Sequence, residues 1–467
     1  MTRRRTTFAS CFLAAGLLAL ALAAPCATLR AQDSTVQRDS LVRVVARLQR
    51  TVDSLRAAAE RQEARVMELD ERTSGPPVSS AAPAATTDSL HRTLPSAEGI
   101  TGKPFVKRFG ASTALGGYVE IAYSNDFQAH ESRFDQVRLV PFIYSEITDK
   151  LHFGTEIEFE HGTQIAVEGG QASGSGEVNV EFATIDYTLK EALAFRAGIV
   201  LEPLGRFNLV HDSPLNELTA RPLVSVLIDG ATLSEAGAGL YGTVYPGKTS
   251  LLSYEIYLVN GFTSSIFVAR TVPGDTVVLR IPAGEGNRGA DNNFAKTVVA
   301  RVAYSPALGL EVGVSGNVGK YARADSLFTG GEWLRVLALD VTWQRGRFAL
   351  FGEWSAVRAD VPAAYAAIGV DGSQNGYYLQ ASWRFAFGAL APRPTSAFTA
   401  ALRWDYVDLS AGRAGDDLRR LTAGVNWRPI ADAALKCDVQ WNWQTPPGAT
   451  SARAPGEALA ISVATYF

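Results

Sequence analysis

Residues 458–467 constrain the fold of this chain more than any other stretch. Leu459, Ile461 and Val463 fall on one face of an extended strand, while small and polar residues fall on the other. About ten alternating residues are the length that a tilted strand needs to cross a bilayer. We therefore expect the apolar face of this strand to meet lipid or a partner surface.

Similar alternating segments fill the chain from residue 115 onward. We predict strands at residues 115–124, 136–147, 151–160, 178–188, 194–202, 234–245, 251–260, 296–305, 308–318, 335–344, 347–357, 377–387, 398–408, 418–428, 433–443 and 457–467. Every second gap between them is short, and the other gaps, including residues 125–135, are expected to be long. This order is typical of an outer-membrane barrel. The sequence thus predicts an all-β fold, a transmembrane antiparallel β-barrel of about 16 strands over residues 110–467.

The polar and apolar residues of several segments assign the two faces of the predicted wall. Trp441 and Trp443, for example, alternate with Gln440 and Asn442. A charged residue on the lipid face costs roughly 2 to 4 kcal/mol near the midplane, so the polar residues should face the lumen. A barrel of about sixteen strands is too wide for side chains to fill. The sequence therefore predicts a water-filled channel, unless a connection between strands blocks it.

The inward positions of the predicted strands carry charges of both signs. The basic candidates for the pore lining are Arg138, Arg196, Arg301, Arg384, Arg403, Arg420, Arg428 and Lys436. The acidic candidates are Glu156, Glu158, Glu160, Glu255, Glu311, Glu353, Asp405 and Asp438, and other inward acids make the acidic set the larger one. Most basic candidates fall in the last strands, and three of the glutamates fall in residues 151–160. We therefore expect opposite signs on opposite sides of the pore, with an anion path along Arg384, Arg403, Arg420 and Arg428.

The connection over residues 203–233 is a candidate constriction. It carries three prolines and the charged or titratable residues Arg206, His211, Asp212, Glu217 and Arg221. Two interpretations stay open for it. The connection folds inward and narrows the pore, or it is an ordinary outer loop with solvated charges.

Residues 1–31 have the features of a secretory signal peptide. Arginines at positions 3–5 precede an apolar run over residues 8–24, and small residues lead to Gln32. A transmembrane anchor and a lipoprotein signal at Cys26 are the alternatives, but the apolar run is short for an anchor. We expect export, after which Cys437 remains alone and no internal disulfide forms.

Residues 36–73 have the heptad pattern of a coiled coil. Between Leu41 and Leu69 apolar residues recur at alternating spacings of four and three, mostly Val or Ala at position a and Leu at position d. A helix that lies on its own barrel is the alternative. A coiled coil would join copies of the chain as a dimer or a trimer. Residues 74–109, rich in Pro, Ser and Ala, are predicted to form a flexible linker to the barrel.

The sequence gives no support for catalysis, a metal or a cofactor. The histidines show no metal-ligand spacing; they are His91, His130, His152, His161 and His211. A formal net charge of −3 provides no basic surface for nucleic acid. Two further classes of function stay open: a structural outer-membrane protein anchored through its coiled coil, and a membrane-embedded barrel hydrolase.

Residues 195–207, FRAGIVLEPLGRF, and the terminal Phe467 carry a family resemblance. The first is similar to the strand of the phosphate-selective porin O and P family that runs into a Pro- and Gly-containing loop. The second matches the terminal aromatic residue that barrel-assembly machinery recognises in outer-membrane proteins. The resemblance implies a porin of the bacterial outer membrane, a homotrimer with a periplasmic coiled coil and a constricting third outer loop. It also implies passive diffusion of small hydrophilic solutes and ions, with pore arginines setting a preference for anions such as phosphate.

Overall fold

The computed structural model describes the C-terminal part of the chain. The described residues are 107–109 and 113–467, except 163, 169–170, 231, 271–275, 286–288, 290, 292 and 391–395. The predicted signal peptide, the predicted coiled coil and most of the predicted linker lie outside the described residues.

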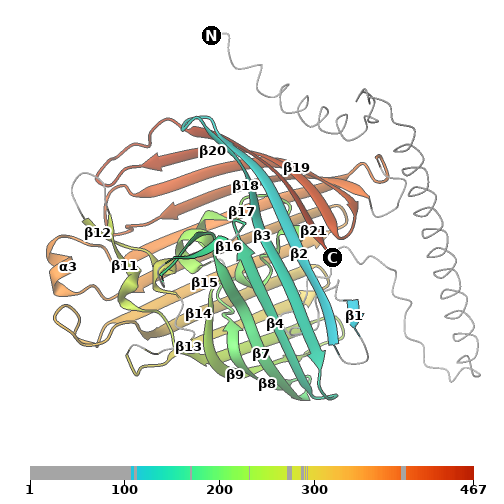
Figure 1. The fold of residues 1–467 in the computed structure, drawn as a ribbon, viewed down its shortest axis with the longest axis horizontal. Helices are drawn as coiled ribbons and strands as arrows, with labels where there is room; N and C mark the ends of the chain where they lie inside the picture. The colour runs from blue at the N-terminus through green and yellow to red at the C-terminus, as the bar shows by residue number, and fades with distance from the viewer. Residues whose placement is uncertain are drawn as a thin grey trace, which may run out of the picture. The chain divides into compact units, whose positions relative to one another are not determined.

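The described residues form a closed β-barrel (Figure 1). Among them the main sheet has 17 strands, and all but the short β1 form the wall. The wall strands are β2 Thr113–Asp126, β3 Glu131–Glu146, β4 Leu151–Glu160, β7 Val178–Lys190, β8 Leu193–Leu201, β9 Ser234–Val244, β10 Leu251–Val259, β13 Thr297–Ala307, β14 Leu310–Lys320, β15 Trp333–Arg345, β16 Phe348–Ala359, β17 Ser373–Phe385, β18 Ala397–Asp408, β19 Asp417–Ile430, β20 Ala433–Thr445 and β21 Gly456–Tyr466. Each pairs antiparallel with the next, and β21 closes the ring on β2, with Tyr466 opposite Tyr118. The prediction of a sixteen-stranded antiparallel barrel is therefore confirmed.

Every strand expected from the alternation has a counterpart in the wall, but one expected connection is wrong. The gap predicted to be long over residues 125–135 is a tight turn, because β2 and β3 pair as far as Asp126 and Glu131. The Asp126 carboxylate accepts hydrogen bonds from the amides of Gln128 (2.8 Å) and Ala129 (2.9 Å), which stabilises the turn. The ends of β2 and β3 are rich in polar residues and do not alternate clearly between polar and apolar, so the sequence pattern did not reveal that these strand ends pair.

The last residues of the predicted linker form a strand instead. Strand β1, Lys107–Phe109, pairs with the start of β2, from Lys107 opposite Leu115 to Phe109 opposite Thr113. The other neighbour of β2, strand β21, pairs only from Tyr118 onward. Because the first residues of β2 would otherwise present an unpaired edge, β1 supplies the missing backbone partners there.

The wall alternates between an exposed apolar face and a buried face. In β15, Leu337 and Leu339 are exposed, whereas Val336 and Ala338 are buried. In β17, Trp383 is exposed while its neighbour Ser382 is buried. The exposed apolar faces form the surface that meets lipid, as expected for a membrane barrel. Within the described residues, no helix is both long enough and apolar enough to span a membrane.

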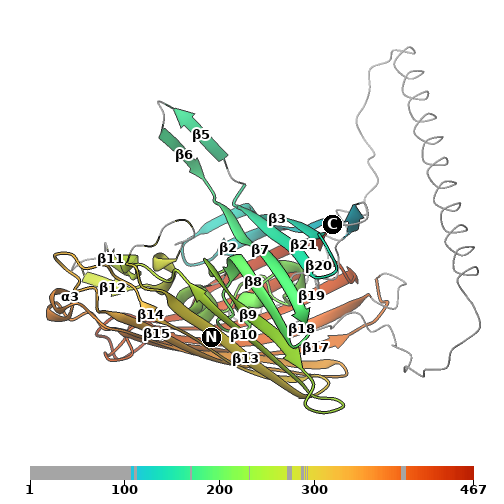
Figure 2. The same ribbon diagram turned by 90° about the horizontal axis from the view of Figure 1, so that it is seen from below.

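Smaller elements occupy the long connections that leave one rim of the barrel. They are the hairpins β5 Gln164–Glu168 with β6 Gln171–Ser175 and β11 Phe267–Arg270 with β12 Thr276–Leu279, and the short helices η3 Phe207–Leu209, η4 Ser213–Leu215, η5 Ser225–Asp229, η6 Ser264–Ile266, η7 Ile281–Gly284 and α3 Ala363–Ala367. Helices η3, η4 and η5 belong to a connection that turns back into the lumen. Figure 2 shows the β5–β6 hairpin extending away from the wall, with α3, β11 and β12 at this rim. The short turns lie at the other rim, except for the turn between β2 and β3.

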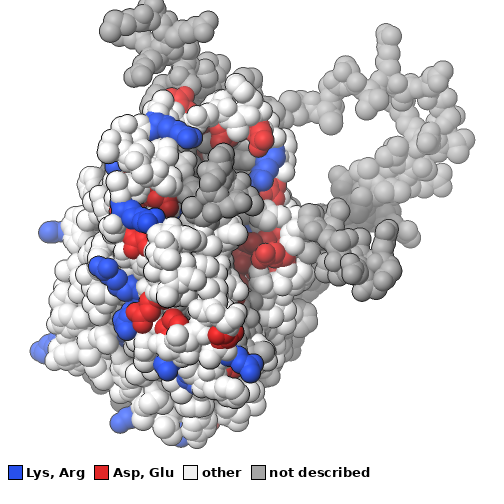
Figure 3. Space-filling view, turned by 90° about the vertical axis from the view of Figure 1, so that its left-hand side faces the viewer, with Lys and Arg blue, Asp and Glu red and all other residues white. Residues whose placement is uncertain are grey.

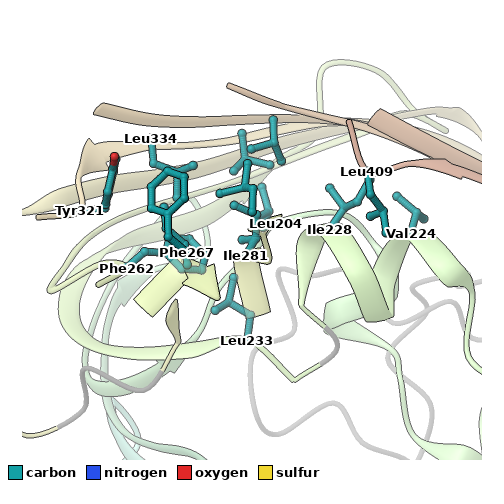
Figure 4. Close-up of a cluster of buried hydrophobic side chains, with 14 of the residues drawn as sticks. Leu204, Val224, Ile228, Leu233, Phe262, Phe267, Ile281, Tyr321, Leu334 and Leu409 are labelled. Atoms are coloured by element: carbon teal, nitrogen blue, oxygen red, sulfur yellow. The ribbon is translucent and has the colours of Figure 1, made fainter. Parts of the chain in front are cut away.

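An apolar cluster fills part of the barrel interior near the rim of long connections (Figure 4). Val224 and Ile228, from the connection after β8, pack with Ile281 of η7 and Phe267 of β11. The cluster also includes Val336 and other inward residues of β15 to β18. Burying this much apolar surface fixes η5 against the wall, since each fully buried aliphatic side chain contributes roughly 1.5 to 3 kcal/mol.

A substitution at Gly198 of β8 tests how closely neighbouring strands pack in the wall. Its φ of +133° is unfavourable for other residues, and a Cβ would lie 2.1 Å from the Ala183 carbonyl oxygen of β7. We expect Gly198→Ala to destabilise the barrel by on the order of 1 to 3 kcal/mol. The measurement is the temperature at which the folded, fast-migrating form disappears on gels. Gly289→Ala is the control, because no atom lies within 4 Å of its added Cβ; equal losses in both variants would contradict this account.

Candidate functional site

The connection over residues 203–233, here called the inner segment, lies inside the barrel. It makes hydrogen bonds to wall strands around the whole circumference; the wall residues include Glu120 of β2, Glu181 of β7, Ser315 of β14, Glu353 of β16, Asp405 of β18 and Asp438 of β20. A segment can reach strands on all sides only by crossing the lumen. Figure 2 shows its short helices enclosed by the strands.

Basic residues of three neighbouring strands donate hydrogen bonds to backbone carbonyls of the inner segment. These four residues, here called the basic strip, are Arg403 of β18, Arg420 and Arg428 of β19, and Lys436 of β20. The donor–acceptor pairs are Lys436 Nζ to Ser213 O (2.6 Å), Arg428 Nη1 to Pro214 O (2.6 Å), and Arg403 Nη2 and Arg420 Nη2 to Arg221 O (3.2 Å each). Three of the four arginines predicted to form an anion path, Arg403, Arg420 and Arg428, thus bind polypeptide backbone in this structure.

Acidic wall residues bind the backbone amides of the same segment. The Asp405 carboxylate accepts from Leu223 N at 2.9 Å, and Asp438 accepts from Thr219 N. Glu353 accepts from the amides of Arg206 (2.7 Å) and Phe207 (3.0 Å). Wall acids and wall bases therefore hold the amides and the carbonyls of one chain segment, so the segment is fixed through its backbone.

The middle of the inner segment is attached through its side chains to the closing seam of the barrel. Tyr466 OH donates to the Asp212 carboxylate at 2.9 Å, and Ser213 Oγ donates to Glu120. His211 is buried, with Nε2 at 3.3 Å from the Glu181 carboxylate.

The other two charged candidates of the segment also meet wall residues. Glu217 lies 3.6 Å from Arg428, and Arg221 Nη2 lies 3.9 Å from Glu158. Together with Arg206, whose guanidinium lies over the Phe351 ring, all five residues proposed for the constriction are placed inside the barrel.

The remaining basic candidates lie in local clusters with acids. Arg138 contacts Glu158 (3.0 Å) and Glu160 (3.2 Å). Arg196 makes two 2.8 Å hydrogen bonds to Asp186 and lies 3.9 Å from Glu255.

A third cluster on β13 to β15 has the same form. Arg301 pairs with Asp340 (2.6 Å) and Glu311 (3.5 Å). Each of these arginines has acids beside it, because a buried charge needs a partner at close range.

Three candidates lie apart from these clusters. Arg384 is half-buried near the rim of short turns. Glu156 accepts a hydrogen bond from Tyr144 OH, inside an aromatic group that includes Tyr118, Phe142 and Tyr466. The terminal Phe467 is exposed, and its amide donates to Gly117 O at 2.9 Å at the seam between β2 and β21.

The wall residues that contact the inner segment are buried. Asp405, Asn426 and Asp438 are 0% exposed. Other inward positions, such as Asn442 of β20 and Glu160 of β4, keep partial exposure toward the rim of long connections. Figure 3 shows acidic and basic side chains intermixed at this rim. The buried inward residues thus lie at the level of the inner segment, and the partly exposed inward residues lie between that level and the rim of long connections.

The structure adds inward residues that the strand pattern did not identify. Glu181 is the extra residue of a bulge, since β4 and β7 pair through Phe182 and then Val180, and this irregularity turns both Glu181 and Phe182 inward. Asp186 follows regular alternation between the exposed Ile185 and Tyr187, so the sequence did contain its signal. A bulge cannot be read from alternation, because it breaks the period of two.

The described residues contain no group of three or more His, Cys, Asp or Glu side chains arranged to hold a metal ion. A closed barrel in lipid, with charged side chains and an inward segment in its lumen, defines an outer-membrane porin channel.

The sequence profile of one family agrees with this assignment. The family described as phosphate-selective porin O and P matches residues 122–465. The chain belongs to the phosphate-selective porin O and P family.

Solved structures and a curated relative add the following similarities. An anion-selective porin from Comamonas acidovorans is 16% identical with a TM-score of 0.47, covering 76% of this chain and 99% of that one. The outer-membrane channel DcaP of Acinetobacter baumannii is 12% identical with a TM-score of 0.46, covering 78% and 100%. An uncharacterized protein of Aquifex aeolicus (strain VF5) is 38% identical over 149 residues, and the match spans 32% of each chain. The chain thus matches about a third of that relative's length.

The buried carboxyl group of Asp229, in η5 of the inner segment, should make the stability of the folded protein depend on pH. Burial, and then the neighbouring Glu353 carboxylate, raise the pKa of Asp229 well above its ordinary value. The folded state therefore keeps a proton that the unfolded state loses from the ordinary aspartate pKa upward, so stability falls as pH rises through that window. We expect the apparent melting temperature in detergent to fall as the pH rises above the ordinary aspartate pKa, and Asp229→Asn to reduce this fall, because each unit of pKa difference between the folded and unfolded states is worth about 1.4 kcal/mol.

The exposed turn residue Asp149 provides the control. Asp149→Asn should leave the pH dependence of the melting temperature unchanged. If Asp229→Asn gives the same slope as the original protein, the buried carboxyl of Asp229 is not its source.

Proposed function

We propose that the chain forms a diffusion channel for small hydrophilic solutes and ions, with anions passing along the basic strip. The observation that carries this proposal is the set of four cationic side chains on the inner faces of β18, β19 and β20. Cations at a narrowed level of a pore attract anions and repel cations, because the low-dielectric wall strengthens their field. The porin from Comamonas acidovorans among the similar structures is itself described as anion-selective.

Acids near the strip limit the strength of this preference. Asp405 lies 2.9 Å from Arg403 and 3.8 Å from Arg420, so part of the positive field is neutralised at close range. We therefore propose moderate anion selectivity, with oxyanions such as phosphate favoured because guanidinium groups bind them in a bidentate way.

Reversal potentials in planar bilayers test the role of the basic strip. We expect Arg403→Gln with Arg420→Gln to shift the purified channel toward cations by several-fold in the permeability ratio, since two of the four cations are lost. Asp438→Asn should shift it the opposite way. Arg345→Gln, at an exposed strand end, is the control. Unchanged selectivity in the double variant would remove the strip from the ion path.

We further propose that the signal peptide exports the chain and that residues 36–73 form a periplasmic coiled coil that joins the barrels into a homotrimer. The support is the heptad pattern and the resemblance to trimeric porins. On this proposal the barrel alone conducts, and the coiled coil contributes association between copies.

A deletion separates the two contributions. Removing residues 36–73 should lower the fraction of trimers in detergent while leaving single-channel conductance per barrel unchanged, because the wall is built from later residues. The measurement combines cross-linking or native mass with bilayer recording. Trimers that survive the deletion at the same dilution would contradict the proposed role of the coiled coil.

A further inference from the structure

The basic strip and the inner segment are arranged as a binding site and its occupant. Two guanidinium groups, those of Arg403 and Arg420, point their Nη2 atoms at a single oxygen, Arg221 O, at 3.2 Å each. Lys436 and Arg428 bind the adjacent carbonyls of Ser213 and Pro214 at 2.6 Å. Two cations that converge on one neutral carbonyl form a position that an oxyanion oxygen would fill with stronger, charge-assisted hydrogen bonds.

Asp405, the acid beside the basic strip, and the inner segment bind different nitrogen atoms of Arg403. Arg403 binds Asp405 through Nε at 2.9 Å and binds Arg221 O through Nη2. Departure of the inner segment therefore leaves the Arg403–Asp405 pair intact. The Nη2 atoms of Arg403 and Arg420 would then be available to another acceptor.

The inner segment also brings its own carboxylate to the strip. Glu217 lies 3.6 Å from Arg428, and its carboxylate and carbonyl both accept from the Asn426 side chain. The segment thus presents a carboxylate and several carbonyl oxygens to the basic strip, which is what an anionic ligand would present.

Two parts of the inner segment, residues 224–229 and residues 211–221, are held in the barrel by different kinds of interaction. Residues 224–229 are anchored by apolar packing, with Val224 and Ile228 in the interior cluster. Residues 211–221 are held to the wall by hydrogen bonds, made both by their backbone and by their side chains. Those bonds lie outside the strand ladders of the wall, so their release leaves the barrel pairing unchanged.

We propose that residues 211–221 form an autoinhibitory latch, which multivalent oxyanions release by competing with the carbonyls of Ser213, Pro214 and Arg221 for the basic strip. The latch builds on the proposed channel function, because it requires a lumen that conducts once it is open. Inorganic phosphate is the probe, and chloride is the weak competitor. With phosphate the ratio of open to closed time should rise by roughly tenfold over chloride at equal ionic strength, as expected when charged acceptors replace neutral ones.

A reversible lock tests the latch directly. Thr219 Oγ1 of the segment lies 3.0 Å from Ser462 Oγ of β21, so cysteines at these positions can form a disulfide. The experiment records Thr219→Cys/Ser462→Cys in planar bilayers, in a Cys437→Ala background that prevents mispairing. The matched controls are the two single cysteine variants.

The latch predicts that phosphate increases open time in the reduced double variant and not in the oxidised one, and that reductant restores the response. An equal response in the oxidised and reduced forms, or a current that phosphate only lowers, would overturn the latch while the channel stands. A protein that never conducts, oxidised or reduced, would overturn the proposed channel and the latch with it.

A second variant tests the competing carboxylate. Glu217→Gln removes the charge that the segment presents to Arg428, so the latch should open more often without phosphate and need less phosphate for the same open time. Glu131→Gln, exposed at the start of β3, is the control. A Glu217→Gln channel with the same phosphate dependence as the control would contradict competition at the basic strip.

Discussion

Backbone N–H and C=O groups inside a bilayer meet no water, so each must find a partner within the protein. This requirement closes the wall: each of the sixteen wall strands pairs on both sides, and β21 returns to β2. The same requirement explains β1, which covers the part of β2 that β21 does not reach. Once the ring is closed, the period of two sends alternate side chains outward to lipid and inward to the lumen. The outer face must then be apolar because it meets hydrocarbon, whereas the inner face contacts whatever fills the lumen.

Inside the ring, a second requirement takes over. Charged side chains in a narrow, partly dry lumen must be neutralised or hydrogen-bonded. The Arg138, Arg196 and Arg301 clusters meet this need with acids on neighbouring strands. The basic strip meets it with the backbone of the inner segment, whose carbonyls accept its hydrogen bonds. On the latch proposal, the same residues would line the open pore and bind the inner segment when it is closed.

The interior also contains apolar groups, which a uniformly wet pore would not favour. Val224 and Ile228 of the inner segment pack against inward residues of β15 to β18, while an aromatic group around Tyr118 and Tyr466 lies by the seam. The apolar cluster thus anchors Val224 and Ile228, whereas Tyr466 holds Asp212 by a hydrogen bond. Apolar burial is non-directional and hard to displace with a solute, whereas a hydrogen bond to a cation can be exchanged for another acceptor. This difference is what separates an anchored part from a releasable part.

The alternation of residues alone determined the sixteen strands and which face of each meets lipid, because a period of two is a local property of the chain. It could not reveal the turn at residues 127–130, the strand β1 or the inward Glu181, since these depend on a neighbouring strand's hydrogen bonds or on a bulge that breaks the period. The charges of the basic strip were also readable one by one. That Arg403 and Arg420 converge on Arg221 O, residues about 180 to 200 positions apart in the chain, was decided only by barrel closure and the inward path of the segment.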